Sequence, residues 1–236
     1  MGKRILLLAD VHLSDATTEK NARFIKFLDD ICATQVSALY ILGDLFDVWL
    51  GDDAPFEIAT PVQHALKELS HRGIPVFIQH GNRDFMLGMR FANACGVNLL
   101  PTAHVLQTAN CRWLLMHGDS LVADSAYLRY RCFIRNPLVV ALAGCLPLSW
   151  RQTLAKKMRA ASKGDVITAV IDATRAEKVL RQYGCQRLLH GHLHQAQNVQ
   201  WKVGDREYQR WCLPAWDNGT GYAEIDDDKL QLVEGR

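Results

Sequence analysis

Short apolar runs that end abruptly in polar residues recur along the chain. The runs cover 5–9, 38–42, 75–79, 113–116 and 187–189. Two stretches with apolar residues at helical spacing, 20–33 and 57–71, separate the early runs. Buried strands that alternate with helices are typical of an α/β layered domain, so we predict that fold class.

The segment 124–183 departs from this pattern, because helical spacing continues through it without a strand. We predict four helices there, over 127–135, 137–150, 152–161 and 166–183. The chain then divides into a core, 1–123 with 184–236, and an inserted helical cap, 124–183, that covers the site. Beyond His194 apolar and polar residues alternate, which predicts strands over 199–203, 207–213, 221–225 and 230–233.

The composition is that of an ordinary globular protein. Of 236 residues, 49% are hydrophobic and 22% are charged, which argues against disorder. The net charge of +2 supplies no strong field for nucleic acid, so we expect no nucleic-acid partner. Seven cysteines at irregular spacing, without a CxxC pair, indicate reduced thiols and a cytosolic setting.

Candidate metal ligands follow each of the five apolar runs, where the loops at the carboxyl ends of strands meet. They are Asp10, His12, Asp44, Asn82, His117, His192 and His194. This mixed set of nitrogen and oxygen ligands suits Mn²⁺, Fe²⁺ or Zn²⁺. The two carboxylate oxygens of Asp44 can bridge two cations, and such a pair activates water for in-line attack on phosphorus. The sequence therefore predicts phosphoester hydrolysis.

The motifs that carry these residues resemble those of the calcineurin-like metallophosphoesterase family. In chain order they are D-x-H, G-D-x-x-D, G-N-x-D, H-G-D and G-H-x-H. The resemblance covers nearly the whole chain and implies a double β-sandwich flanked by helices, with a dinuclear centre. By matching motifs, one metal is held by Asp10, His12, Asp44 and His194. The other is held by Asp44, Asn82, His117 and His192.

The third motif departs from the common G-N-H-D form, because Arg83 replaces the histidine. An arginine does not give up its proton, but it pairs with phosphate oxygens and stabilises developing charge. A pyrophosphate, whose leaving group is already good, fits this residue better than an alkyl phosphomonoester. The predicted catalytic residues are Asp44, Asn82, Arg83 and His117.

Longer stretches resemble one branch of the family, the UDP-2,3-diacylglucosamine pyrophosphatases of lipid A synthesis. These stretches are 40–53, 80–88, 115–119 and 157–163. The resemblance implies two Mn²⁺ ions and water attack on the α-phosphorus of UDP-2,3-diacylglucosamine, giving UMP and lipid X. It also implies substrate contacts from Asn82, Arg83, Asp124, Tyr127, Arg159, Ser162, Lys163 and His192. After Ser162 the chain is several residues shorter than that branch, and no residue matches a second substrate-contacting lysine.

The apolar stretch 137–150 lies between basic residues on both sides. It is too short to span a bilayer, which needs about 20 residues. Apolar and basic residues together suit an acyl-chain groove and a surface that faces anionic headgroups. With the resemblance, this predicts a monomer in peripheral contact with the cytoplasmic side of a bacterial inner membrane. The alternative is that 137–150 is an ordinary buried helix of the cap.

Three other functions remain open from the sequence. A related phosphoesterase could act on a soluble nucleotide, and a non-catalytic scaffold could use the same fold, although scaffolds usually lose metal ligands. Nucleic-acid cleavage is weakened by the near-neutral charge. Among nearby residues, His190 matches no ligand position, and we expect Asp47, Asp84 and Asp119 to orient loops or ligand imidazoles.

Overall fold

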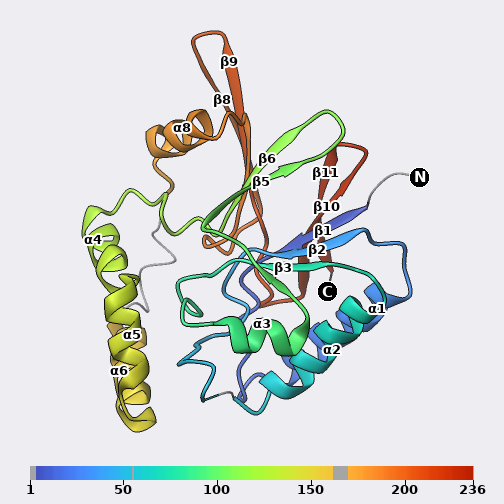
Figure 1. Ribbon diagram of the computed structural model, residues 1–236. Coiled ribbons are helices and arrows are strands. Elements are labelled where there is room, and N and C mark those ends of the chain that lie inside the picture. The colour runs from blue at the N-terminus through green and yellow to red at the C-terminus, as the bar shows by residue number, and fades with distance from the viewer. Residues whose placement is uncertain (1–3, 55, 162–169, 236) are drawn as a thin grey trace.

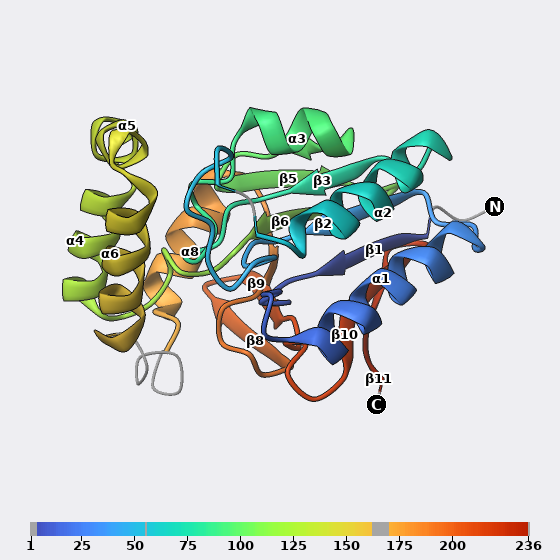
Figure 2. The ribbon, with the colours of Figure 1, turned by 90° about the horizontal axis from the view of Figure 1, so that it is seen from below.

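The computed structural model describes residues 4–54, 56–161 and 170–235, without the side chains of 158–161. Two mixed sheets lie face to face between layers of helices (Figures 1 and 2). The first sheet has the order β11-β10-β1-β2-β3-β4. Its strands are β1 (Ile5–Leu8), β2 (Ala38–Ile41), β3 (Val76–Ile78), β4 (Asn98–Leu99), β10 (Thr220–Asp226) and β11 (Lys229–Gly235).

The second sheet has the order β5-β6-β7-β9-β8. Its strands are β5 (Ala103–Gln107), β6 (Arg112–Met116), β7 (Arg187–His190), β8 (Gln197–Val203) and β9 (Arg206–Cys212). Strands β1 to β4 are parallel in the first sheet, and β6, β7 and β9 are parallel in the second. Parallel strands place their carboxyl ends at one edge of each sheet, and the loops from both edges meet there.

Alternating side chains of each strand fill two different cores. In β1, Leu6 and Leu8 pack toward the helices, whereas Ile5 and Leu7 pack between the sheets. Such strands are apolar on both faces, which is why they read as continuous runs in the sequence. The helix-facing core is covered by α1 (Thr18–Cys32), α2 (Ala59–His71) and α3 (Met89–Cys95).

The outer face of the second sheet packs on α8 (Ala173–Gln182). Ala176 and Leu180 of this helix belong to a third hydrophobic core, which lies between the second sheet and α8. The helix expected over 166–183 begins later, since Ile171 forms a β-bridge with Val122 and Asp172 caps the first turn of α8. Residues 170–172 are therefore not helical, and 166–169 lie outside the described residues. The predicted sandwich flanked by helices is confirmed.

Three further helices stand beside the sandwich (Figures 1 and 2). These cap helices are α4 (Ser125–Ile134), α5 (Pro137–Cys145) and α6 (Leu148–Ala161). The single helix expected over 137–150 is interrupted, because Leu146, which precedes Pro147, adopts an extended backbone. The expectation of one cap over 124–183 stays a prediction.

Apolar side chains of the cap helices are exposed. Leu138 is 75% exposed, Leu142 69% and Trp150 66%, and neither α4 nor α5 contains a buried residue. The interpretation of 137–150 as an ordinary buried helix is therefore wrong.

Candidate metal centre

Loops from both sheets bring the seven predicted ligands together. Each ligand comes within a few residues of the carboxyl end of β1, β2, β3, β6 or β7, so strand direction decides where it lies. The structure joins all seven by short contacts between side chains, and they form a continuous row.

One half of the row is built around Asn82. Its Oδ1 lies 2.9 Å from His117 Nε2 and 3.1 Å from His192 Nδ1. His117 Nε2 in turn lies 3.7 Å from Asp44 Oδ2. The Nδ1 atom of His117 contacts Leu42 O at 2.9 Å. That contact favours a proton on Nδ1, which leaves Nε2 with a lone pair for a cation.

The other half of the row begins at the same carboxylate. Asp44 Oδ2 lies 3.9 Å from His12 Nε2, so it faces imidazoles of both halves. His12 Nε2 and His194 Nε2 are 3.0 Å apart, and Asp10 Oδ1 is 3.7 Å from His194 Nε2. Among the described residues, two groups of His and Asp could hold a metal: Asp10 with His12 and His194, and Asp10 with Asp44 and His117.

Most of these residues occupy a strained backbone conformation. Five have positive φ: Asp10 (54°), His12 (54°), Asp44 (53°), His192 (73°) and His194 (57°). Non-glycine residues adopt this region rarely, and a cluster of them indicates a functional constraint. The strain allows successive residues of one loop to direct their side chains to one point.

The motif glycines let the loops approach these residues closely. A Cβ at Gly81 would lie 1.9 Å from Asp44 Oδ1, and one at Gly191 would lie 2.5 Å from Asp10 Oδ2. Neither position can hold a side chain without displacing a ligand. The glycines before Asn82 and His192 in the motifs G-N-x-D and G-H-x-H thus have a steric explanation.

Buried carboxylates hold the loop backbones in place. Asp84 accepts hydrogen bonds from the amides of Leu45 and Gly81, at 2.8 and 2.7 Å. The amide of His192 donates to Asp10 Oδ2 at 2.7 Å, and that of Arg83 donates to Asp44 Oδ1 at 2.8 Å. Asp84 therefore orients loops, as expected, while Asp10 and Asp44 each keep a second oxygen directed into the row.

Burial perturbs the charges of the row. It raises the pKa of Asp10 to about 6. Burial and the neighbouring Asp84 raise the pKa of Asp44 well above its ordinary value. Burial lowers the pKa of His192 to about 3 and that of His12 well below its usual value. Desolvated carboxylates need a compensating positive charge, and neutral imidazoles are the form that binds metals.

One buried oxygen tests whether the row fits cations. Asp10 Oδ1 has no hydrogen-bond partner among the described residues, although it is buried. It faces His12 Nε2 at 4.0 Å and His194 Nε2 at 3.7 Å. An unpaired buried carboxylate oxygen beside two imidazole nitrogens is what a divalent transition metal requires, so the residues fit.

Some of the predicted substrate-contacting residues lie in or near the row, one lies at the exposed start of α4, and three cannot be placed. Asn82 and His192 lie in the row, Arg83 is half-buried beside it, and the Tyr127 ring lies 6.1 Å from that of His192. Asp124 is exposed and caps α4, accepting from the amides of Ala126 and Tyr127. The side chain of Arg159, and Ser162 and Lys163 entirely, lie outside the described residues.

Arginines connect the cap helices to the loops of the row. Arg131 Nε and Arg135 Nη2 pair with buried Asp119 at 2.7 and 2.8 Å, and Arg135 also donates to Gly81 O at 2.6 Å. Burial opposes ionisation of Asp119, but Arg135 and its neighbours prevail and hold the pKa of that carboxyl at about 2. The prediction that Asp119 orients a loop or a ligand imidazole did not include these arginine pairs, because Arg131 and Arg135 lie outside the five motifs.

A further arginine, Arg151, connects α6 to the loop that follows β2. Arg151, which is buried, donates to Leu50 O at 2.7 Å and pairs with Asp53. The cap helices α4 and α6 are thus joined to the loops that follow β2, β3 and β6, next to the predicted metal ligands.

Asp217 is a further residue that the sequence did not reveal. Its Oδ2 lies 3.4 Å from His194 Nδ1, and Lys20 Nζ donates to its other oxygen at 2.9 Å. A carboxylate on the second nitrogen fixes the orientation of a ligand imidazole. His190, in contrast, uses its two ring nitrogens to contact Gly191 O (2.8 Å) and Arg210 (3.2 Å), consistent with its exclusion from the ligand set.

Comparisons with known proteins agree with this geometry. The model of the calcineurin-like phosphoesterase family matches residues 3–196. A UDP-2,3-diacylglucosamine hydrolase of Pseudomonas fluorescens (strain SBW25) is 38% identical over 235 residues, 97% of this chain and 94% of that protein. One from Proteus mirabilis is 37% identical over 97% of this chain and 98% of that protein.

Among solved structures, a dimetal phosphatase from Danio rerio is 11% identical with a TM-score of 0.52, and the alignment covers 99% of each chain. At that identity the likeness concerns the fold alone. The family model, the relatives and the fold agree, and the chain belongs to the calcineurin-like phosphoesterase family.

Proposed function

We propose that this metallophosphoesterase hydrolyses the pyrophosphate of UDP-2,3-diacylglucosamine, giving UMP and 2,3-diacylglucosamine 1-phosphate (lipid X) in lipid A synthesis. The observation that carries the proposal is the position of an exposed apolar cap beside a row of metal ligands. Relatives that match 97% of the chain bear this activity in their names, which supports the same substrate.

The exposed side chains of the cap helices offer an apolar surface for the acyl chains of a lipid substrate. Leu138, Leu142 and Trp150 each keep about two thirds or more of their surface in water. Leu138 and Leu142 are four residues apart on α5 and so lie on one face of that helix. Contiguous exposed apolar patches commonly serve interaction with apolar partners. The soluble-nucleotide alternative gives these side chains no role.

In this proposal the row holds two Mn²⁺ ions, with Asp44 as the shared ligand. When bound, the ions supply activation of water and stabilisation of charge on phosphoryl oxygens. Asn82, His117 and His192 orient one end of the row, and Asp10, His12 and His194 the other.

Arg83 has a separate role in the proposal. Its backbone is fixed by two hydrogen bonds, from its amide to Asp44 Oδ1 and from the Trp49 amide to its carbonyl oxygen. Burial is the main cause of the lowered pKa of His12, and the charges of His194 and Arg83 lower it further, so the Arg83 charge is felt in the row. It is suited to pair with the α-phosphoryl oxygens and to stabilise charge that develops as the anhydride breaks.

We also propose that the cap contacts the cytoplasmic face of the bacterial inner membrane peripherally, and that the protein acts as a monomer. No helix in the described part of the chain is long and apolar enough to cross a bilayer. Lys156 and Lys157 lie exposed on α6, the same helix that presents Trp150. Apolar and basic side chains on one helix favour the interface with anionic lipid.

The test is hydrolysis of UDP-2,3-diacylglucosamine in detergent micelles with Mn²⁺ in ¹⁸O-labelled water, beside a UDP-glucosamine without acyl chains. We expect label in UMP and a higher kcat/KM for the acylated substrate. Label in lipid X instead would move the attack to the β-phosphorus. Equal kcat/KM for both compounds would favour the soluble-nucleotide alternative, and no hydrolysis would overturn the proposal.

The role of Arg83 has its own test. Arg83→Ala should lower turnover by about 100-fold or more, since it removes a charge-stabilising donor from the reacting group. Two metals per chain should remain, because the side chain is not a ligand. Arg90→Ala, an exposed position seven residues away, is the matched control. Loss of metal in Arg83→Ala would assign the residue to the metal centre rather than to the substrate.

A further inference from the structure

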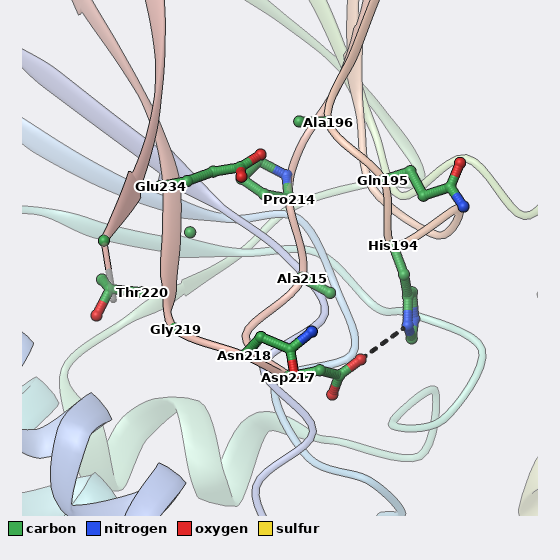
Figure 3. A pocket seen from close by; sticks show the side chains of 12 residues that line it. His194, Gln195, Ala196, Pro214, Ala215, Asp217, Asn218, Gly219, Thr220 and Glu234 are labelled. Atoms are coloured by element: carbon green, nitrogen blue, oxygen red, sulfur yellow. Dashed lines mark ion pairs between the residues drawn. The ribbon is translucent and has the colours of Figure 1, made fainter.

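A groove of about 540 Å³ lies beside the metal row on the side of His194. It is bounded by the segment before β8, by the loop between β9 and β10, and by the end of β11 (Figure 3). Asp217 and His194 face each other at one margin, with Asn218 next to Asp217, and Glu234 lies on the other side of the groove. Neither motif matching nor the mechanism gives this groove a function.

The row of ligands has two distinguishable ends. At one end, Tyr127 of the cap lies beside His192, which contacts Asn82. At the other end, His12 contacts His194, which faces Asp217 at the margin of the groove. The cap and the groove therefore flank the metal centre on opposite sides, joined by the contacts of the row.

A substrate with a central pyrophosphate has two ends as well. If the reacting phosphorus lies over the row, the acylated sugar extends from one side of it and the nucleoside from the other. The exposed apolar cap accounts for the acyl chains. The nucleoside then needs a polar cavity adjoining the opposite end, and the groove is in that place.

The chemistry of the groove selects for an uncharged polar ligand. None of the described residues that line it is Lys or Arg, so it offers no counter-charge to a further phosphate. The side chains of Asn218 and Glu234 make no hydrogen bond or ion pair with any described residue. An amide matches the donor and acceptor edge of a pyrimidine, and a carboxylate accepts from ribose hydroxyls.

We propose that this groove binds the nucleoside half of the substrate, with Asn218 and Glu234 as its polar contacts and Ala196 and Pro214 as apolar walls. The inference rests on the proposed function for the identity of the nucleotide. The volume of the groove falls within the range of about 300–1,000 Å³ usual for small-molecule sites. The methyl group of Ala196 lines the groove, so a larger side chain there would occupy the space.

The test measures binding rather than turnover, so it does not depend on whether the lipid substrate is hydrolysed. Isothermal titration of the Mn²⁺-loaded full chain with UMP, inorganic phosphate and ribose 5-phosphate separates the phosphate from the nucleoside. We expect UMP to bind at least about tenfold more tightly than phosphate. Ribose 5-phosphate should fall between them.

Two variants and one control locate the contacts. Ala196→Phe fills the groove and should lower the ratio of UMP affinity to phosphate affinity about tenfold. Asn218→Ala removes one hydrogen bond and should lower the same ratio about two- to tenfold. Ala33→Phe, exposed at the end of α1, should leave the ratio unchanged, and metal content confirms folding of each variant. UMP binding no tighter than phosphate, or an unchanged ratio in both groove variants, would overturn the proposal.

Discussion

Replacing Gly81 by alanine tests whether close loop contact creates the metal centre. The added Cβ would lie 1.9 Å from Asp44 Oδ1 and 2.2 Å from the Asp44 amide nitrogen. Ordinary carbon contacts begin near 3.4 Å, so Asp44 or the loop must move by about 1.5 Å. Because Asp44 lies between the two halves of the row, that displacement affects both proposed metals.

A misplacement of about 1 Å at a reacting centre costs about 100-fold in rate, so we expect at least that loss for Gly81→Ala. Manganese bound per chain, measured by elemental analysis after desalting, should fall below two. Activity is followed with bis(4-nitrophenyl) phosphate, a small phosphodiester that needs neither the cap nor the groove. Overpacking of this kind also costs about 1–3 kcal/mol of stability.

Gly204→Ala is the matched control. Gly204 lies in the β8–β9 turn with φ of 60°, and a Cβ there meets no atom within 4 Å. The substitution strains the backbone by about 1 kcal/mol but displaces nothing. It should keep both metals and full activity. A Gly81→Ala protein with two metals and unchanged turnover would refute the steric explanation of the motif glycine.

Two further predictions concern charge burial and thiol reactivity. Asp119→Asn should destabilise the protein by about 3 kcal/mol in urea unfolding and speed hydrogen exchange in α4, because Arg131 and Arg135 lose a buried partner. Asp30→Asn, in an exposed pair with Lys26, should cost at most about 0.5 kcal/mol, and equal costs would contradict the assigned role of Asp119. Burial raises the pKa of the Cys95 and Cys212 thiols to about 12, so both stay protonated at pH 8. Iodoacetamide should therefore label exposed Cys132 and Cys145 first, as mass spectrometry can verify, and early labelling of Cys212 would show that the core opens.

The sequence predicted those parts of the fold that depend on local patterning. The strands after which ligands follow were found because both of their faces are buried, which makes them continuous apolar runs. The short strand β4 and helix α3 were missed, since two residues and seven residues carry too little periodicity. The break at Leu146 could have been foreseen from the proline that follows it.

In the candidate site too, some residues could be predicted from the sequence and others could not. The seven predicted ligands lie in compact motifs, so their meeting at one place could be predicted from the chain; their role as ligands and their assignment to two metals stay predictions. The residues that hold the predicted ligands in place could not be predicted from sequence motifs. Lys20 and Asp217 are 197 positions apart, and Arg135 reaches Gly81 over 54 positions. Such pairs have no spacing rule, because only the packing of separate elements brings them together.

Five predicted ligand residues have positive φ, which among the other described non-glycine residues only Asp227 and Asp228 share. The surrounding contacts explain how the fold tolerates this backbone conformation. A residue held in the left-handed region costs about 1–3 kcal/mol, and five of the seven ligands are held there. The carboxylate of Asp84 accepts hydrogen bonds from the amides of Asp44 and Leu45, and that of Asp10 accepts one from the amide of His192. Each carboxylate therefore acts on the backbone of another motif. The motifs hold one another in the strained backbone conformation that directs their side chains into the row. Grafting a single motif into another protein would therefore not reproduce the position of its ligand side chain.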